Sequence, residues 1–206
     1  MKKYALIIMS LWAVVSMQGR DITDVFVDMP DSLMPMLSQN ARKDLIDFYK
    51  SGMKPLLPNE MSANSQLTKI DDNLLVLDED SHGLVTTTMA LLNLKERDSI
   101  VCMIRTIKCP QPDSEIFFFT TSWQQLKTQK FLVLPTPQET RTATRGSVVD
   151  YTCITLETPK GQNPLLSVAI DASDGIVKDD ADFGSNTDKK PTFHYEWNGT
   201  KFIKKQ

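Results

Sequence analysis

Short β-like runs follow one another along most of the chain, with only brief polar gaps between them. The runs rich in β-branched and aromatic residues are 67–70, 74–77, 84–94, 99–108, 115–121, 131–134, 148–156, 165–170, 192–197 and 201–204. Parallel neighbours need a crossover of about a dozen residues or more, usually a helix, and most of these gaps are too short for one. The pattern therefore predicts antiparallel sheet built from hairpins.

One amphipathic helix is expected ahead of the strands, over residues 31–51. Asp31 or Ser32 provides the cap, and apolar residues recur every three or four positions from 37 to 49. Gly52 marks the end of the helix. We therefore predict an α+β fold in which an N-terminal helix packs on an antiparallel β-sheet.

The composition of the chain changes near its middle. Residues 135–146 hold prolines, threonines and charges without apolar periodicity, which is typical of a linker. We expect a helix-plus-sheet subdomain over 20–134 and a β-rich subdomain over 147–206. A long hairpin followed by an aromatic strand occurs in each part, ending at Trp123 and at Trp197. This repetition raises the alternative of two similar β-rich subdomains.

The first residues are expected to be a signal that is removed. Lys2 and Lys3 precede an apolar run that stops at the polar residues 18–21, the pattern of a secretory signal peptide over 1–19. A membrane-spanning helix needs about 20 apolar residues, and this run is shorter. An uncleaved anchor or a buried helix is the alternative. The mature protein is thus expected in the periplasm or at the cell surface, with no membrane span.

The charge of the chain narrows the class of partner. It has 23 Lys and Arg residues against 26 Asp and Glu residues, for a formal net charge of −3. Loss of Lys2 and Lys3 with the signal makes the mature chain still more acidic, at −5. Proteins that bind nucleic acid need a basic surface to neutralise phosphates. Nucleic acid is therefore not an expected partner.

Three cysteines remain in the mature chain: Cys102, Cys109 and Cys153. Cys102 and Cys109 lie in one extended run and on opposite faces of it, so they are poorly placed to pair with each other. A disulfide from Cys153 to either of them is the alternative in an oxidising compartment. We expect three separate buried thiols.

No catalytic motif is present in the sequence. The two histidines, His82 and His194, are not spaced as metal ligands, and neither a Gly-x-Ser-x-Gly elbow nor a glycine-rich phosphate loop occurs. We therefore expect no cofactor and no enzymatic activity. Two carboxylates that are distant in sequence and meet in space, as in a glycosidase, are the enzymatic alternative.

Two groups of residues are candidates for binding. Asp180, Asp182 and Asn186 lie in an Asp- and Gly-rich insertion, and oxygen-rich loops of this kind favour calcium, although the glycine is misplaced for an EF-hand. Trp123 and Trp197 lie at strand ends, where an indole ring can contact a sugar or a protein partner. Packing in the core or at its rim is the alternative for both tryptophans.

Several short pieces occur in an order that resembles a known family. They are Met29-Pro30-Asp31-Ser32, the run 42–49, the run 106–110, Asp113-Ser114 and Trp123. Together they resemble an uncharacterised secreted family of Bacteroidales bacteria, the domain of unknown function 3256. The resemblance implies an exported protein of a Gram-negative gut or oral bacterium, and it carries no activity or residue role.

The expected function is non-catalytic. Export, a β-rich body and the missing catalytic motifs indicate a binding or structural protein of the bacterial cell envelope, with an envelope protein or a glycan as its partner. One alternative is a hydrolase that cleaves envelope polymers or glycans with a carboxylate pair. A second alternative is a secreted enzyme inhibitor that presents the loop 171–190.

Overall fold

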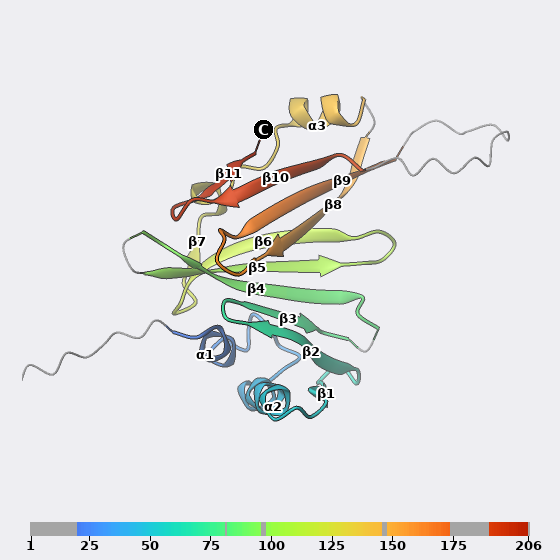
Figure 1. The fold of residues 1–206 in the computed structure, drawn as a ribbon. Helices are drawn as coiled ribbons and strands as arrows, with labels where there is room; N and C mark the ends of the chain where they lie inside the picture. Colours follow the sequence, from blue (N-terminus) through green and yellow to red (C-terminus); the bar gives the residue numbers. More distant parts are fainter. Residues whose placement is uncertain (1–19, 81, 96–97, 146–147, 174–189, 206) are drawn as a thin grey trace, which may run out of the picture.

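The computed structural model describes residues 20–80, 82–95, 98–145, 148–173 and 190–205 (Figure 1). The predicted signal peptide therefore lies outside the described residues. So do the predicted calcium ligands Asp180, Asp182 and Asn186 and most of the loop 171–190.

Two antiparallel sheets make up the body of the molecule. The larger sheet has the strand order β1-β2-β3-β4-β5-β6-β7 and the smaller sheet the order β11-β10-β9-β8. The strands are β1 (Leu56–Pro58), β2 (Asn64–Asp71), β3 (Leu74–Asp78), β4 (Val85–Asn93), β5 (Ser99–Ile107), β6 (Asp113–Thr120), β7 (Gln125–Leu126), β8 (Val148–Glu157), β9 (Leu165–Ser173), β10 (Thr192–Trp197) and β11 (Phe202–Lys204). Since neighbours in each sheet are consecutive in sequence, both sheets are meanders, which confirms the antiparallel prediction.

The helices lie on one side of the larger sheet and beside the smaller one. The helices α1 (Ile22–Val27) and α2 (Gln39–Lys50) cover one face of the larger sheet, and the smaller sheet packs on its other side (Figure 1). A short 3₁₀ turn, η1 (Thr128–Lys130), and the helix α3 (Pro137–Ala143) connect the two sheets. The structure thus confirms an α+β fold with an N-terminal helix on antiparallel sheet.

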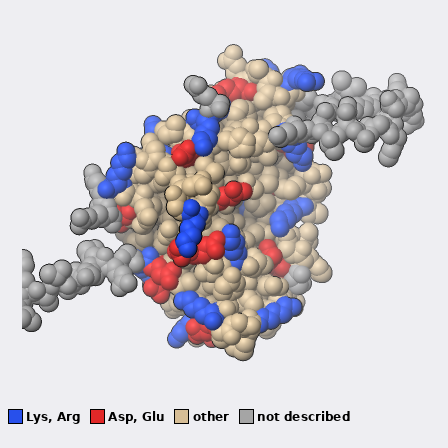
Figure 2. Space-filling view, in the orientation of Figure 1, with Lys and Arg blue, Asp and Glu red and all other residues tan. Residues whose placement is uncertain are grey.

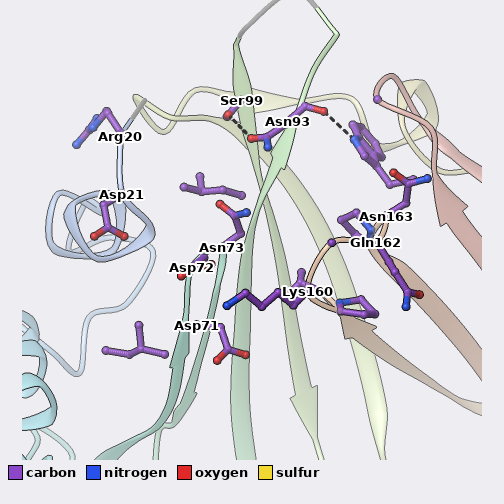
Figure 3. Close-up of a pocket in the computed structure, with 18 of the residues that line it drawn as sticks. Arg20, Asp21, Asp71, Asp72, Asn73, Asn93, Ser99, Lys160, Gln162 and Asn163 are labelled. Atoms are coloured by element: carbon purple, nitrogen blue, oxygen red, sulfur yellow. Dashed lines mark hydrogen bonds between the residues drawn. The ribbon is translucent and has the colours of Figure 1, made fainter. Parts of the chain in front are cut away.

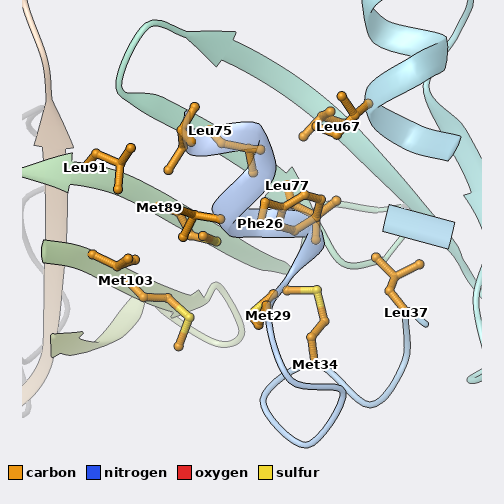
Figure 4. Packing of buried hydrophobic residues seen from close by; sticks show 14 of the residues in the cluster. Phe26, Met29, Met34, Leu37, Leu67, Leu75, Leu77, Met89, Leu91 and Met103 are labelled. Atoms are coloured by element: carbon orange, nitrogen blue, oxygen red, sulfur yellow. The ribbon is translucent and has the colours of Figure 1, made fainter. Parts of the chain in front are cut away.

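Strand alternation divides the core into two clusters. Met89 and Leu91 of β4 point to α1 and α2, whereas Ala90 and Leu92 point to the smaller sheet. Figure 4 shows the helix-side cluster, where Phe26 of α1 packs against leucines of the sheet. The larger sheet is therefore apolar on both faces, as its near-continuous hydrophobic strands require.

The two sheets meet along β6 and β8. The Asp113 carboxylate accepts a hydrogen bond from the Thr152 backbone N–H at 3.0 Å, and the Ser114 hydroxyl accepts one from the Ile154 N–H at 3.0 Å. Because β7 pairs only with Phe118 and Phe119, the first half of β6 is left open for β8. Side chains rather than a backbone ladder therefore join the sheets at this seam.

The N-terminal helix is shorter than the predicted 31–51. It begins at Gln39, where the Ser38 hydroxyl accepts a hydrogen bond from the Ala41 N–H at 3.3 Å. Asp31, one of the predicted caps, instead accepts a hydrogen bond at 3.0 Å from the guanidinium of Arg42. Residues 31–37 form turns rather than helix, so the prediction was wrong there.

The predicted strand at 131–134 is also wrong. The chain is irregular there, and Leu132 is buried in the inter-sheet cluster while Val133 and Leu134 are exposed. The predicted linker 135–146 contains α3, which the Thr136 hydroxyl and the Glu139 carboxylate cap reciprocally.

Asn198-Gly199 does join the last two strands, but not as a two-residue turn. Trp197 pairs with Phe202, so the loop spans residues 198–201. The Asn198 side-chain oxygen accepts hydrogen bonds from the N–H groups of Thr200 and Lys201, both at 2.9 Å. An Asn-Gly pair between two strand-like runs predicts a two-residue type I′ turn, and that prediction is wrong here because Asn198 forms an Asx turn instead.

The cysteines are only partly as predicted. All three are free, but Cys109 is exposed, Cys153 is half-buried and only Cys102 is fully buried. Burial raises the pKa of the Cys102 thiol. Cys109 is exposed because β5 ends before it, so no sheet neighbour covers its side chain.

Candidate functional site

Four turns from the two sheets meet at one end of the molecule. Alternate turns of a meander lie at the same end of its sheet. In the larger sheet these are the turns after β2 and after β4, and in the smaller sheet the turns after β8 and after β10. Their residues line a single open cleft of about 1060 Å³, called here the turn cleft.

Contacts between turns of different sheets hold the cleft in shape. The Trp197 indole N–H donates to the Asn93 backbone oxygen at 2.9 Å, and the Lys95 N–H donates to the Gly199 oxygen at 3.1 Å. Gly199 has φ +84°, and a Cβ atom there would lie 2.9 Å from Lys95 Cγ. A glycine therefore suits this position, where the turns after β4 and β10 are in contact.

Three walls surround the turn cleft. Figure 3 shows Arg20 and Asp21 before α1 on one side, and residues 71–73 of the β2–β3 turn in the middle. Lys160 and Gln162 of the β8–β9 loop lie opposite, with Lys160 pointing across the cleft towards the acidic turn (Figure 3). The walls therefore offer amides, carboxylates and an ammonium group to one shared space.

Four of these side chains have no partner among the residues that the structure describes. Asp72, Asn73, Lys160 and Gln162 make no side-chain hydrogen bond or ion pair with any described residue. Asp72, Lys160 and Gln162 are also exposed. Since they do not serve the fold, these groups are available to a ligand.

Neighbouring polar groups in the cleft are fixed by internal contacts. Asp71 forms an ion pair with Lys69 at 2.8 Å, and the Asn93 side-chain oxygen accepts a hydrogen bond from Ser99 at 3.0 Å. The Asn163 amide donates to Glu196 at 2.9 Å. That bond, together with Lys205, holds the pKa of the Glu196 carboxyl below its usual range. The cleft thus combines preoriented polar groups with free ones.

Both predicted binding tryptophans are buried. Trp123 is 9% exposed, donates its indole N–H to the Val25 oxygen at 3.0 Å and does not line the turn cleft. Trp197 borders the cleft but is only 3% exposed. Neither ring has a free face for a sugar to stack on. The geometry supports core packing, the alternative considered for both residues.

The described residues contain no cluster of three or more His, Cys, Asp or Glu side chains that would hold a metal ion. The acid of a glycosidase lies in a largely apolar setting. Asp71 and Asp72 are instead exposed, and Asp71 is already paired with Lys69. Neither carboxylate therefore has the apolar surroundings of a glycosidase acid.

The four unpartnered cleft residues were not predicted from the sequence, because they carry no motif. Asp72, Asn73, Lys160 and Gln162 are turn residues of ordinary type. The order of the strands could have indicated part of this site, because in a meander the turns after every second strand lie at the same end of the sheet. The packing of the two sheets decides which turns of the smaller sheet face those of the larger one. The pattern of strands in the sequence does not determine this packing.

The fold and the cleft together define a class, an α+β protein of two packed meanders with a polar cleft at their joined turns. The chain belongs to the family described as Protein of unknown function (DUF3256), which matches residues 14–159. This confirms the family expected from the sequence.

One solved structure shows the same fold. The chain is similar to a domain of an uncharacterized protein from Porphyromonas gingivalis W83, with a TM-score of 0.64 and 20% sequence identity. The similarity covers 88% of this chain and 98% of that one. No curated protein matches the chain. In the part of the chain that the structure describes, no helix has the length and apolar character needed to cross a bilayer.

Proposed function

We propose that the protein is an exported, non-catalytic binding protein of the bacterial cell envelope, and that its turn cleft binds a glycan. The observation that carries the proposal is the convergence of four polar side chains on one cleft, none of them with a partner in the described part of the chain. They are Asp72, Asn73, Lys160 and Gln162. The signal-like pattern of residues 1–19 supports export.

The chemistry of these groups suits a ligand rich in hydroxyls. Each sugar hydroxyl donates one hydrogen bond and accepts others. The amides of Asn73 and Gln162 match both roles, while Asp72 accepts and Lys160 donates. The length of the cleft across four turns leaves room for several sugar units.

A protein partner is a weaker match to the turn cleft. Protein interfaces depend on a few anchors, most often Trp, Tyr and Arg, that are buried on binding. Trp197, the aromatic residue that borders the cleft, is already buried against the turn of the other sheet.

Charges of both signs are interspersed over the face seen in Figure 2. A neutral or mixed-charge polar ligand therefore fits better than a strongly charged one.

The proposal is tested by calorimetric titration with size-fractionated glycan fragments from the native envelope. We expect at least one fraction to bind the mature protein. Asn73→Ala and Gln162→Ala should each weaken that binding about fivefold, the loss typical of one hydrogen bond. Gln111→Ala is the matched control, since it removes an exposed amide after β5, at the opposite end of the larger sheet.

Two outcomes would overturn the proposal. One is the absence of heat with every glycan fraction, and the other is equal binding by wild type, Asn73→Ala and Gln162→Ala. The same incubations test the hydrolase alternative. New reducing ends that disappear in Asp72→Asn would show catalysis in place of simple binding.

A further inference from the structure

A second pocket lies at the free edge of the smaller sheet and shares no residue with the turn cleft. Residues 129–136 and the strand β11 form its two sides, and it encloses about 300 Å³. The segment that follows η1 contacts β11 first through a hydrogen bond, which the Phe202 N–H donates to the Phe131 oxygen at 2.7 Å. It contacts β11 again at Glu139, which forms an ion pair with Lys204 at 2.6 Å. Between these contacts the segment leaves β11, and the gap is called here the edge pocket.

The strand β11, which borders the edge pocket, has backbone N–H and C=O groups that are not paired within its sheet. β11 is the last strand of its sheet. The Asn198 N–H donates to the Lys201 oxygen and the Lys205 N–H to the His194 oxygen, so the bonded positions of β11 are 201, 203 and 205. The N–H and C=O of Lys204 therefore point away from the sheet, as those of Phe202 do. An edge of this kind pairs readily with another extended chain.

A buried phenol without a partner lines the edge pocket. Tyr195 lies opposite Lys204 in the sheet and is 2% exposed, and its hydroxyl has no hydrogen-bond partner among the described residues. Burial, together with the charge of Glu139, raises the pKa of Tyr195, so the phenol keeps its proton as a donor. A buried donor without an acceptor is unusual in a folded protein, and a ligand oxygen would satisfy it.

The rim of the edge pocket is both apolar and basic. Val133, Leu134 and Ile203 are among the large hydrophobic residues that the structure leaves exposed. Lys130 and Lys201 also line the pocket, and neither forms an ion pair with a described residue. In a chain that is acidic as a whole, two uncompensated ammonium groups beside an apolar rim favour an anionic, apolar ligand.

We propose that the edge pocket binds the C-terminal end of a partner peptide that finishes in an apolar residue. The peptide backbone extends β11, the last side chain enters the pocket against Val133 and Ile203, and the terminal carboxylate lies among the lysines and the Tyr195 hydroxyl. The volume matches one large side chain rather than a long segment. The free backbone groups of Lys204 favour a peptide over a simple fatty acid, which has no amide to pair with them.

The test is fluorescence anisotropy with labelled hexapeptides that carry each of the twenty amino acids at the last position. Each peptide is made with a free and with an amidated C-terminus. We expect the mature protein to bind free-acid peptides that end in Leu, Val, Ile or Phe. Amidation should weaken that binding at least about tenfold, because it removes the charge that the lysines recognise.

Two variants locate the binding in the edge pocket. Lys201→Ala should weaken the best peptide about tenfold. Tyr195→Phe should weaken it about fivefold without lowering the urea midpoint of unfolding, because the lost hydroxyl has no internal partner. The matched controls are Lys54→Ala, near β1, and Tyr151→Phe, in β8; both should bind as wild type does.

Three results would overturn this proposal. They are no binding by any free-acid peptide, equal binding by amidated peptides, and complete displacement of the peptide by octanoate at matched concentration. Each leaves the glycan proposal untouched, because the turn cleft and the edge pocket share no residue.

Discussion

Single buried side chains hold the irregular parts of this chain in place. Arg42 is fully buried, and its guanidinium donates to the backbone oxygens of Val27, Met29 and Leu37 as well as to Asp31. These backbone oxygens belong to the last residue of α1 and to the turns before α2, where no helix or sheet partner is in place to satisfy them. One cation in the first turn of α2 therefore organises the whole connection.

Arg42→Met should lower the free energy of unfolding by about 3–5 kcal/mol, because several buried oxygens lose their donor at once. Arg42→Lys should recover only part of this loss, since an ammonium group lacks the planar fork that reaches several acceptors. Urea unfolding measures both changes. Lys43→Met, an exposed neighbour on α2, is the control and should stay within about 0.5 kcal/mol of wild type. Equal stability of Arg42→Met and Lys43→Met would contradict this role.

Glu139 is the residue whose titration reports the docking of α3. Hydrogen bonds from the Lys204 side chain and then from Thr136 hold the pKa of Glu139 at about 2, below its ordinary value of 4.5. The folded-state pKa is depressed, so its contribution to stability is present above about pH 4.5 and is lost as the pH falls towards 2. Carboxyl NMR should show the low midpoint in wild type and a rise towards 4.5 in Lys204→Ala. A midpoint unmoved by that substitution would contradict the pairing.

At the scale of elements, the strands were predictable and the irregular connections were not. Alternation and turn residues located nearly every long strand, because each buries one or two apolar faces that show in the sequence. The helix α1 was missed because six residues are too few to show a period. The run 131–134 was wrongly predicted as a strand because its residues are apolar, as those of a buried strand are. In the structure Leu132 is buried, whereas Val133 and Leu134 are exposed.

The hydrogen bonds of the seam between β6 and β8 join the two sheets. Ser114→Ala removes the acceptor of the Ile154 N–H and should lower the free energy of unfolding by about 1–2 kcal/mol. Hydrogen exchange at the Ile154 amide should accelerate more than exchange within β4. Ser32→Ala, in the exposed turn after α1, is the matched control and should change neither quantity. Unchanged exchange at Ile154 in Ser114→Ala would mean that the seam does not depend on this bond.

At the scale of the whole molecule, both candidate sites arise from the way two meanders are put together. The turn cleft exists because the turns after β4 and β10 are tied through Asn93, Lys95, Trp197 and Gly199. The edge pocket exists because the connection between the sheets contacts β11 at Phe131 and at Glu139 but is separated from it in between. The sequence showed that Trp197 sits at a strand end, but not that the opposite turn would bury it. That contact depends on inter-sheet packing, which has no local sequence signal.

Binding of glycans in the turn cleft is tested most directly by an amide chemical-shift map of the mature protein titrated with envelope glycan fragments. We expect the shifts to concentrate at residues 71–73 and 158–164, with little change at the β5–β6 turn at the opposite end. Shifts spread evenly over the molecule, or confined to residues away from the four joined turns, would contradict a glycan site in the turn cleft.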